Sequence, residues 1–219
     1  MTTTKSTPAR KRASSCQNSE PEIWRGLDLT WHPELPNVIR RVVSWYNAGC
    51  GGLVLAGGFG CGKTHIAHEV YEVAAPNGPA RRLPDVFDWS AKHVESVSDG
   101  QFYKEPKLLE KIRQSYSDDG RGDREIIRDC QTTRCLILDD LGAAYVKDSS
   151  RDWYEDLIWR LFDARIDAGL LTLITTNLPP ADLKIRIGGR AFSRLQQMLG
   201  SPENFVLMFD INDFRARDW

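Results

Sequence analysis

Long hydrophobic runs are missing from this 219-residue sequence. No apolar stretch approaches the roughly 18 residues that a helix needs to cross a bilayer, and the N-terminus lacks the apolar middle section of a secretory signal peptide. The sequence therefore argues against a membrane protein and against a secreted one. We expect a soluble, cytoplasmic protein with no membrane partner.

An excess of charge of one sign is also absent. Lysine and arginine total 29, aspartate and glutamate total 30, and the formal net charge is −1. Attraction to nucleic acid would therefore have to come from local basic patches and not from the whole surface. Residues 1–20 contain one short basic run, but they have almost no large apolar side chain, so we expect a disordered basic tail there.

The sequence also lacks paired cysteines. The sequence contains five cysteines, an odd number, with no C-x-x-C pair and no histidine at metal-binding spacing: Cys16, Cys50, Cys61, Cys130 and Cys135. A disulfide framework and a zinc site are therefore not indicated, and reduced thiols are the simplest account. Cys61 lies inside a glycine-rich stretch, where a small side chain is tolerated.

The composition fits one globular domain. A hydrophobic fraction of 41% over 219 residues is enough to bury a substantial core. After the tail, residues 21–49 form an N-terminal arm and a helix, with apolar residues at helical spacing after Pro36. Residues 50–219 then make up the main domain.

The most informative stretch begins with an apolar strand at Leu53–Ala56. It continues as a glycine-rich turn whose residues 57–64 match the phosphate-loop pattern G-x-x-x-x-G-K-[ST]. Glycines let successive backbone N–H groups turn inward around a polyphosphate, and the following helix points its N-terminal N–H groups at the same anion. The expected nucleotide-binding residues are Gly57, Gly58, Phe59, Gly60, Cys61, Gly62, Lys63, Thr64 and His65. Lys63 would contact the β- and γ-phosphates, and Thr64 would bind Mg²⁺.

A second strand ends in two carboxylates. The apolar run at 135–138 is followed directly by Asp139 and Asp140. At the carboxyl end of a parallel strand beside a phosphate loop, Asp139 would hold Mg²⁺ and Asp140 would orient or deprotonate the attacking water. The alternative is that the two aspartates only form a turn at the end of the strand. The phosphate loop upstream favours the magnesium site over this alternative.

Strands and helices alternate in the rest of the chain, which predicts an α/β fold with a parallel sheet and helices on both faces. We expect helices over 66–74, 91–97, 105–116 and 152–167 and from residue 188 onward, and strands over 85–89, 170–177 and 205–209. Asn177, at the end of one strand, could hydrogen-bond the γ-phosphate or the water, or could simply form a turn. Lys104, Lys107, Lys111 and Arg113 are expected on one helix face, as a solvated surface or a nucleic-acid or partner contact.

Four motifs in this order resemble the DnaC/IstB-type AAA+ ATPases, a family of helicase loaders and transposition helpers. They are G-x-x-G-x-G-K-T-H from Gly57, L-I-L-D-D-L-G from Leu136, L-I-T-T-N-L from Leu173 and G-x-R-x-x-S-R-L from Gly188. The likeness spans roughly residues 50 to 210. It implies a five-stranded AAA+ P-loop NTPase sheet. The sequence departs from the family in its short C-terminal part, so we expect a reduced or absent lid. The likeness also implies that Lys63 and Thr64 form Walker A, Asp139 and Asp140 form Walker B, and Asn177 is sensor 1.

The resemblance also implies an arginine that completes the active site of a neighbouring subunit. Arg194 is the first choice and Arg190 the second, while Arg215 is a weaker candidate for a sensor 2 role. A guanidinium on the γ-phosphate offsets transition-state charge and can be worth about 10³ to 10⁵ in rate. Ordinary surface ion pairs are the alternative for both arginines.

The function that this resemblance implies is that of a DnaC-like helicase loader with ATP and Mg²⁺ as cofactors. ATP hydrolysis would be slow and stimulated by assembly or by DNA. The expected partners are DNA, single-stranded DNA first, a replicative helicase or transposase, and further copies of the chain. The alternatives are an IstB-like transposition helper, a nucleotide-gated interaction protein with negligible turnover, and a small-molecule kinase. The Asp-Asp and Thr-Asn strand ends favour hydrolysis over the kinase.

Overall fold

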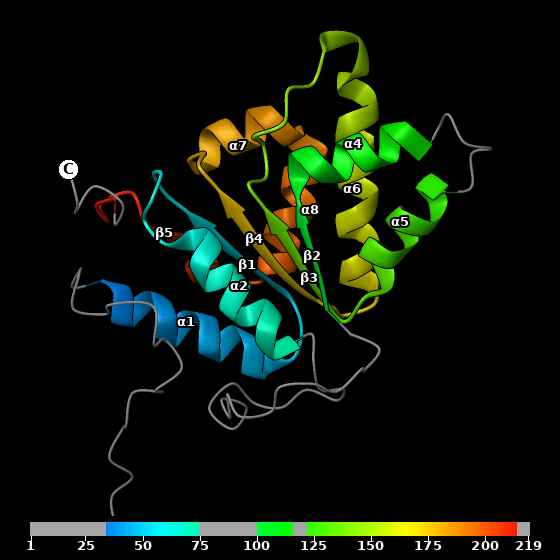
Figure 1. The fold of residues 1–219 in the computed structure, drawn as a ribbon. Coiled ribbons are helices and arrows are strands. Elements are labelled where there is room, and N and C mark those ends of the chain that lie inside the picture. Colours follow the sequence, from blue (N-terminus) through cyan, green and yellow to red (C-terminus); the bar gives the residue numbers. More distant parts are fainter. Residues whose placement is uncertain (1–33, 75–99, 116–121, 214–219) are drawn as a thin grey trace, which may run out of the picture.

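The structure is a computed structural model that describes residues 34–74, 100–115 and 122–213 (Figure 1). The basic tail, most of the N-terminal arm, the elements expected at 85–89 and 91–97, and Arg215 lie outside the described residues. The division of the chain into tail, arm and main domain therefore stays a prediction.

A five-stranded parallel sheet forms the centre of the molecule, in the order β2-β3-β4-β1-β5. The strands are β1 (Gly52–Ala56), β2 (Gly100–Lys104), β3 (Cys135–Asp139), β4 (Leu171–Thr176) and β5 (Phe205–Leu207). Every residue of β1, β3 and β4 is buried, because helices cover both faces of a parallel sheet. The predicted α/β fold with a five-stranded parallel sheet is confirmed.

Two layers of helices cover the sheet (Figure 1). One layer consists of α1 (Leu35–Ala48) and α2 (Lys63–Ala74), and the other contains α4 (Glu105–Ser115), α5 (Gly122–Thr132), α6 (Arg151–Asp167), α7 (Pro180–Ile187) and α8 (Gly189–Leu199). Short 3-10 turns, η2 (Asp148–Ser150) and η3 (Pro202–Asn204), precede α6 and β5. Side chains alternate between the two cores. In β1, Leu53 and Leu55 join the α1–α2 core and Val54 joins the opposite one.

Arg165 of α6 holds the amino-terminal ends of β3 and β4 in place. Its side chain is completely buried. The guanidinium donates to Thr172 Oγ1 at 2.8 Å, to the carbonyl oxygens of Cys130 at 2.7 Å and Thr133 at 2.9 Å, and to that of Leu171. Burial lowers the pKa of Arg165 to about 10. The charge is tolerated because its N–H groups find acceptors.

Three elements differ from the sequence-based prediction. The edge strand β2 is absent from that prediction because it is short and half-exposed, with Phe102 and Tyr103 pointing into opposite cores. Lys104 therefore ends a strand and does not belong to the face of α4. Helix α5 carries few apolar residues. Helix α7 begins at Pro180. We interpreted this proline and the one before it only as the end of β4. Proline also suits the first turn of a helix, so α7 was missed.

The strand order determines where the phosphate loop and the strand-end carboxylates can meet. β4 separates β1 from β3, and the carboxyl ends of all three strands lie at one edge of the sheet. The phosphate loop after β1 and the carboxylates after β3 therefore meet across the end of β4. Within the described residues, no helix combines the length and the apolar character that a membrane span requires.

Candidate nucleotide and magnesium site

The phosphate loop connects β1 to α2. Gly60 has a φ of 71° and Gly62 a φ of 93°, in the left-handed region that favours glycine. A Cβ atom added to Gly57 would lie 2.7 Å from the carbonyl oxygen of Met208, so the end of β5 also requires glycine there. Helix α2 starts at Lys63, which places the N-terminus of a 12-residue helix at the loop. This arrangement suits a bound phosphate group.

Lys63 is 5% exposed and turns into its own loop. Its ammonium donates to the carbonyl oxygens of Gly57 at 2.9 Å and Gly58 at 2.6 Å, and lies 3.5 Å from Cys61 Sγ. The buried Cys61 thiol donates to Gly58 O at 3.1 Å, as expected for a packed loop residue. His65, on the first turn of α2, forms an ion pair of 3.8 Å with Glu69 when it is protonated. To bind a phosphate, Lys63 has to exchange its carbonyl acceptors for phosphate oxygens.

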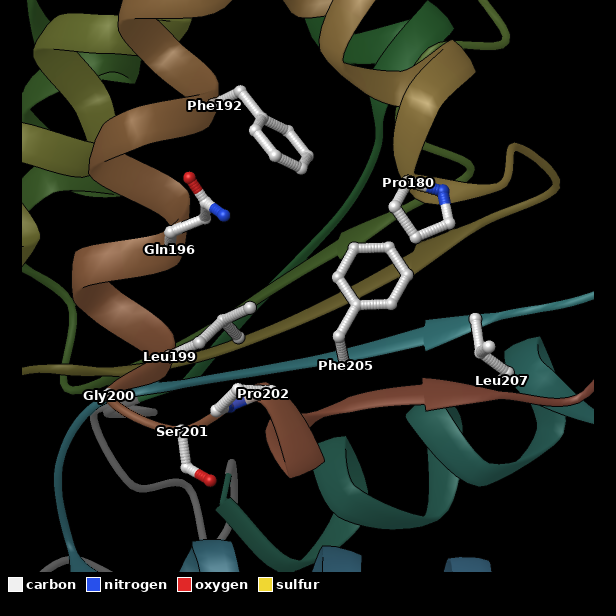
Figure 2. A pocket seen from close by; sticks show the side chains of 9 residues that line it. All are labelled: Pro180, Phe192, Gln196, Leu199, Gly200, Ser201, Pro202, Phe205 and Leu207. Carbon is white, nitrogen blue, oxygen red and sulfur yellow. The ribbon is translucent and has the colours of Figure 1, made fainter.

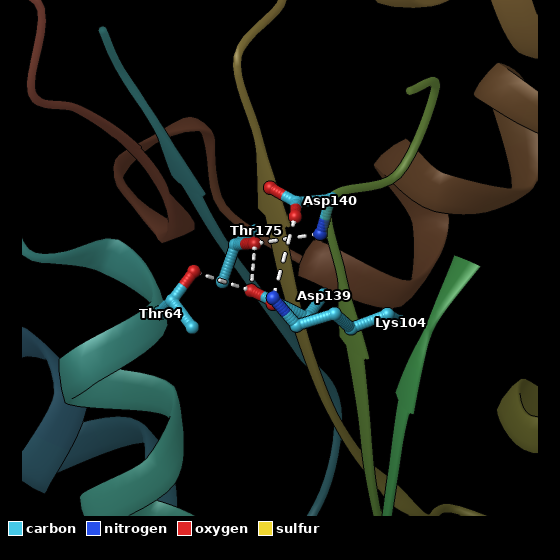
Figure 3. A network of polar contacts seen from close by, with 5 residues as sticks. All are labelled: Thr64, Lys104, Asp139, Asp140 and Thr175. Carbon is cyan, nitrogen blue, oxygen red and sulfur yellow. Dashed lines mark hydrogen bonds and ion pairs between the residues drawn. The ribbon is translucent and has the colours of Figure 1, made fainter. Parts of the chain in front are cut away.

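Asp139 is the centre of the polar network in Figure 3. Its side chain is fully buried, and Oδ1 accepts hydrogen bonds from Thr64 Oγ1 at 2.9 Å and from Thr175 Oγ1 at 2.6 Å. The structure thus joins the phosphate-loop helix to the end of β3 through one carboxylate oxygen. Thr175 was missed in the sequence analysis. The available signal was a hydroxyl group one residue before the end of β4, a strand that also contains Thr172 and Thr176.

Asp140 has a backbone that few non-glycine residues adopt, with a φ of 59°. Its N–H donates to Thr175 Oγ1 at 2.9 Å, and the next residue, Leu141, donates its N–H to the Thr175 carbonyl at 2.8 Å. Burial and the neighbouring Asp139 raise the pKa of the Asp140 carboxyl, while Lys104 and Lys63 act in the opposite direction. A raised pKa brings a carboxylate closer to the value that suits a general base at neutral pH.

Lys104 lies beside both carboxylates. Its ammonium is 3.6 Å from Asp139 Oδ2 and 3.9 Å from Asp140 Oδ2 (Figure 3). The sequence analysis placed this lysine on a helix face. The register of β2 against β3 pairs Lys104 with Asp139 and overturns that placement.

Glu105 holds the loop that follows the two aspartates. The carboxylate is buried, and Oε2 accepts N–H groups from Gly142 at 3.0 Å and Ala144 at 2.9 Å, while Oε1 accepts the Tyr154 hydroxyl. Arg186 closes the same loop by donating to Gly142 O at 3.1 Å. Burial raises the pKa of Glu105, and these hydrogen bonds and Arg186 partly oppose the rise.

Asn177 follows β4 directly and is half-buried at the same edge of the sheet. The preceding Thr176 donates its hydroxyl to Leu141 O at 2.8 Å and accepts the N–H of Leu178 at 3.1 Å. The bond to Leu141 ties the end of β4 to the loop after β3, and the bond from Leu178 holds the turn that contains Asn177. The structure therefore brings Asn177 to the edge that carries the two aspartates.

The two candidate arginines lie on α8, against α6 and outside the network of Figure 3. Arg194 Nε contacts Asp163 Oδ1 at 2.8 Å, and its Nη1 donates to Gln197 Oε1 at 2.6 Å. The guanidinium of Arg190 stacks 3.5 Å from the ring centre of Trp159. Within this chain, the structure does not bring either arginine to the carboxylates.

The donor set fits Mg²⁺. Asp139 Oδ2 is buried and accepts no hydrogen bond from the described residues, with the Asp140 carboxylate next to it in sequence. Across the described segments, no group of three or more His, Cys, Asp and Glu side chains could hold a metal ion by itself. Magnesium is typically bound by one or two carboxylates together with substrate phosphates, so it does not need such a group.

Two surface hollows lie near the site. One, of about 590 Å³, is bordered by the loop after Asp140, by Arg151 and by Arg186. The other, of about 350 Å³, lies between α8 and β5 (Figure 2) and is lined mainly by Pro180, Phe192, Leu199, Pro202, Phe205 and Leu207. This second hollow is apolar and opens on the side of the sheet away from α2, so it is not the phosphate site.

Comparison with known proteins identifies the fold. No protein-family model and no curated protein matches the sequence. The crystal structure of the DnaC helicase loader is 23% identical, with a TM-score of 0.53, over 81% of this chain and 95% of that one. Domain III of the Thermotoga maritima replication initiation protein DnaA is 16% identical, with a TM-score of 0.59, over 86% of this chain and 66% of that one.

A third structure is the replication initiator DnaA bound to AMPPCP and single-stranded DNA. It is 11% identical, with a TM-score of 0.55, over 88% of this chain and 50% of that one. This chain thus spans nearly the whole DnaC structure but only half to two thirds of the DnaA structures. It has the AAA+ P-loop NTPase fold that DnaC and DnaA share.

Proposed function

We propose that this chain is an ATP-binding and ATP-hydrolysing AAA+ protein that acts on DNA as a DnaC-like helicase loader. One observation carries the proposal: Thr64, from the phosphate-loop helix, and Asp139, from the end of β3, meet in a hydrogen bond of 2.9 Å. A phosphate loop alone would bind phosphate. The junction with two strand-end carboxylates adds what nucleotide hydrolysis needs.

Each residue then has a role. Lys63 and the loop N–H groups hold the phosphates, Thr64 and Asp139 hold Mg²⁺, and Asp140 orients the attacking water and accepts its proton. The metal ion would supply charge neutralisation on the phosphate oxygens. Asn177 hydrogen-bonds the γ-phosphate or the water from the end of β4.

Arg194, with Arg190 as the second candidate, acts on the nucleotide of a neighbouring subunit. Support comes from position, since both lie on α8 and not beside the carboxylates of their own chain. The contacts with Asp163 and Gln197 engage Nε and Nη1 of Arg194. Its Nη2 group can bind a phosphate. Turnover should therefore require assembly.

The surface beside the site supports DNA as a partner. The loop after Asp140 exposes 81% of Tyr145, next to a hollow bordered by Arg151 and Arg186. Aromatic faces stack on unpaired bases and arginines contact the backbone, so single-stranded DNA is the expected ligand. A solved structure of DnaA, which has the same fold, shows that protein bound to single-stranded DNA.

The test measures ATPase rate and sedimentation of the purified chain with and without single- and double-stranded DNA. Lys63→Ala should abolish turnover. Arg194→Ala should leave nucleotide binding intact and abolish the rise in rate that assembly produces. Arg160→Ala is the matched control, because Arg160 also forms a surface ion pair, 2.8 Å from Asp156.

A protein that stays monomeric and indifferent to DNA would contradict the loader function. Nucleotide binding without turnover would instead support the nucleotide-gated interaction protein. Retained ATP- and DNA-dependent assembly, with a transposase and not a replicative helicase as the partner, would support the IstB-like transposition helper.

A further inference from the structure

The pairing of β2 with β3 places Lys104 beside the two aspartates. It is the last residue of the edge strand β2, and β2 pairs with β3 so that Lys104 lies level with Asp139. Its ammonium therefore sits 3.6 Å from Asp139 Oδ2 and 3.9 Å from Asp140 Oδ2 (Figure 3). Both distances exceed a direct hydrogen bond, so the contact is a loose pairing of charges.

Among the described residues, the other donors near the two aspartates have acceptors other than Asp139 Oδ2. Thr64 and Thr175 both donate to Asp139 Oδ1, and Oδ2 accepts no hydrogen bond from the described residues. The other nearby ammonium, that of Lys63, donates to carbonyl oxygens of its own loop. Within the described part of the chain, Lys104 is the cation that forms ion pairs with both aspartates.

We propose that Lys104 is a positioning residue that neutralises Asp139 and Asp140 and that Mg²⁺ has to displace when it binds. The inference rests on the magnesium site of the proposed function. A magnesium ion lies about 2.0 to 2.1 Å from its oxygen ligands, so an ion on Oδ2 would face the ammonium of Lys104 at short range. Like charges at that separation repel each other strongly in a partly buried site.

Lys104 can give way without unpacking the protein. Its side chain is 44% exposed, whereas Asp139 is fully buried. The flexible lysine stem lets the ammonium move into water while the carboxylate stays in place. Lys104 thus weakens metal binding in the absence of nucleotide. The negative phosphates of ATP then favour the bound metal ion over the ion pair with Lys104. Magnesium and nucleotide should bind together.

The experiment measures Mn²⁺ binding to the full chain without nucleotide, from the electron paramagnetic resonance signal of free Mn²⁺. Mn²⁺ accepts the same oxygen ligands as Mg²⁺. Lys104→Met should bind Mn²⁺ about tenfold more tightly than the unmodified protein, because one positive charge has gone. Lys104→Arg, which keeps the charge, should bind weakly. Lys107→Met, at an exposed lysine on the next helix, should match the unmodified protein.

A second measurement covers the case in which weak metal binding escapes detection. Millimolar Mg²⁺ should raise the thermal unfolding midpoint of Lys104→Met by several degrees and leave that of the unmodified protein nearly unchanged, because only a bound ligand stabilises the folded state. Equal Mn²⁺ affinity and equal Mg²⁺ response in Lys104→Met and Lys107→Met would overturn the role of Lys104.

A third measurement distinguishes an error in the proposed magnesium site from an error in the role of Lys104. In the presence of ATP, the unmodified protein should bind Mn²⁺ and Asp139→Asn should lose that binding. If Asp139→Asn binds Mn²⁺ and ATP as well as the unmodified protein, the metal site of the proposed function is wrong, and the role of Lys104 falls with it. If Asp139→Asn loses the metal but Lys104→Met changes nothing, only the inference about Lys104 is rejected.

Discussion

The hydroxyl group of Thr175 joins both aspartates of the site: it donates to Asp139 Oδ1 at 2.6 Å and accepts the backbone N–H of Asp140 at 2.9 Å. One threonine on β4 therefore orients the carboxylate of Asp139 and fixes the backbone of Asp140. Residues that orient a metal-binding side chain typically contribute 10- to 100-fold to metal affinity or activity.

Replacing Thr175 with valine should keep the shape of the buried side chain and remove both hydrogen bonds. We expect about a 10- to 100-fold loss in ATPase rate and a higher Mg²⁺ concentration for half-maximal rate. A Mg²⁺ titration of the ATPase checks this. Thr172→Val is the control, since Thr172 is buried in the same strand but accepts from Arg165. It should reduce stability and leave the Mg²⁺ midpoint unchanged. The same Mg²⁺ midpoint in Thr175→Val would contradict an orienting role.

Gly60 should not tolerate alanine. Its φ is 71°, and an added Cβ atom would lie 1.6 Å from Asp213 Oδ1, so the phosphate loop or the segment around Asp213 has to move. We expect Gly60→Ala to lower ATP affinity at least about tenfold, measured with a fluorescent nucleotide, because loop shape sets the direction of the N–H groups. Gly189→Ala has open space around its Cβ and no positive φ, and should bind ATP normally. Normal affinity in Gly60→Ala would show that the loop adapts.

Arg165 should matter for stability and not for the site. Arg165→Met would leave the carbonyl oxygens of Cys130, Thr133 and Leu171 without their buried donor. We expect a loss of about 3 kcal/mol in the free energy of unfolding, measured by urea denaturation. Arg160→Met removes an exposed pair, 54% and 44% accessible, and should change that free energy by less than about 0.5 kcal/mol. Equal effects of the two changes would be inconsistent with the bonding of Arg165.

Glu105 should make stability depend on pH. Burial raises its pKa above the ordinary 4.5, so the folded state holds the proton more tightly than the unfolded chain. The stabilisation is complete below the unfolded pKa and is lost as pH rises through the folded pKa. Between about pH 4 and the raised value, the free energy of unfolding should therefore fall with increasing pH, and Glu105→Gln should remove this part of the slope.

The pH measurement compares urea denaturation of the two proteins over that range. Asp140, whose pKa is also raised, is present in both proteins, so the difference between their curves isolates Glu105. Glutamine can still accept the two backbone N–H groups, and the loop should keep its shape. Parallel pH profiles in the two proteins would exclude a contribution from Glu105.

Local patterns predicted most of the fold. The buried strands β1 and β3 are short, mainly apolar runs, and β4 is a run of leucine, isoleucine and threonine between Gly169 and Pro179. Helix α6 has a wide apolar stripe, so neighbouring residues alone indicate all four elements. Edge strand β2 and helix α5 were missed because half-exposed elements lack such runs. Helix α7 was missed because its opening proline also serves to end a strand.

The sequence by itself determined the phosphate loop and the carboxylates at the end of β3, because each is a short motif whose chemistry depends on adjacent residues. Only the tertiary structure decided the contacts of Lys104, Glu105 and Thr175. Each of these residues lies more than 30 positions from its partner at the site, and no local pattern encodes such a distance. Their meeting follows from the strand order β2-β3-β4-β1, which brings the carboxyl ends of distant segments to one edge of the sheet.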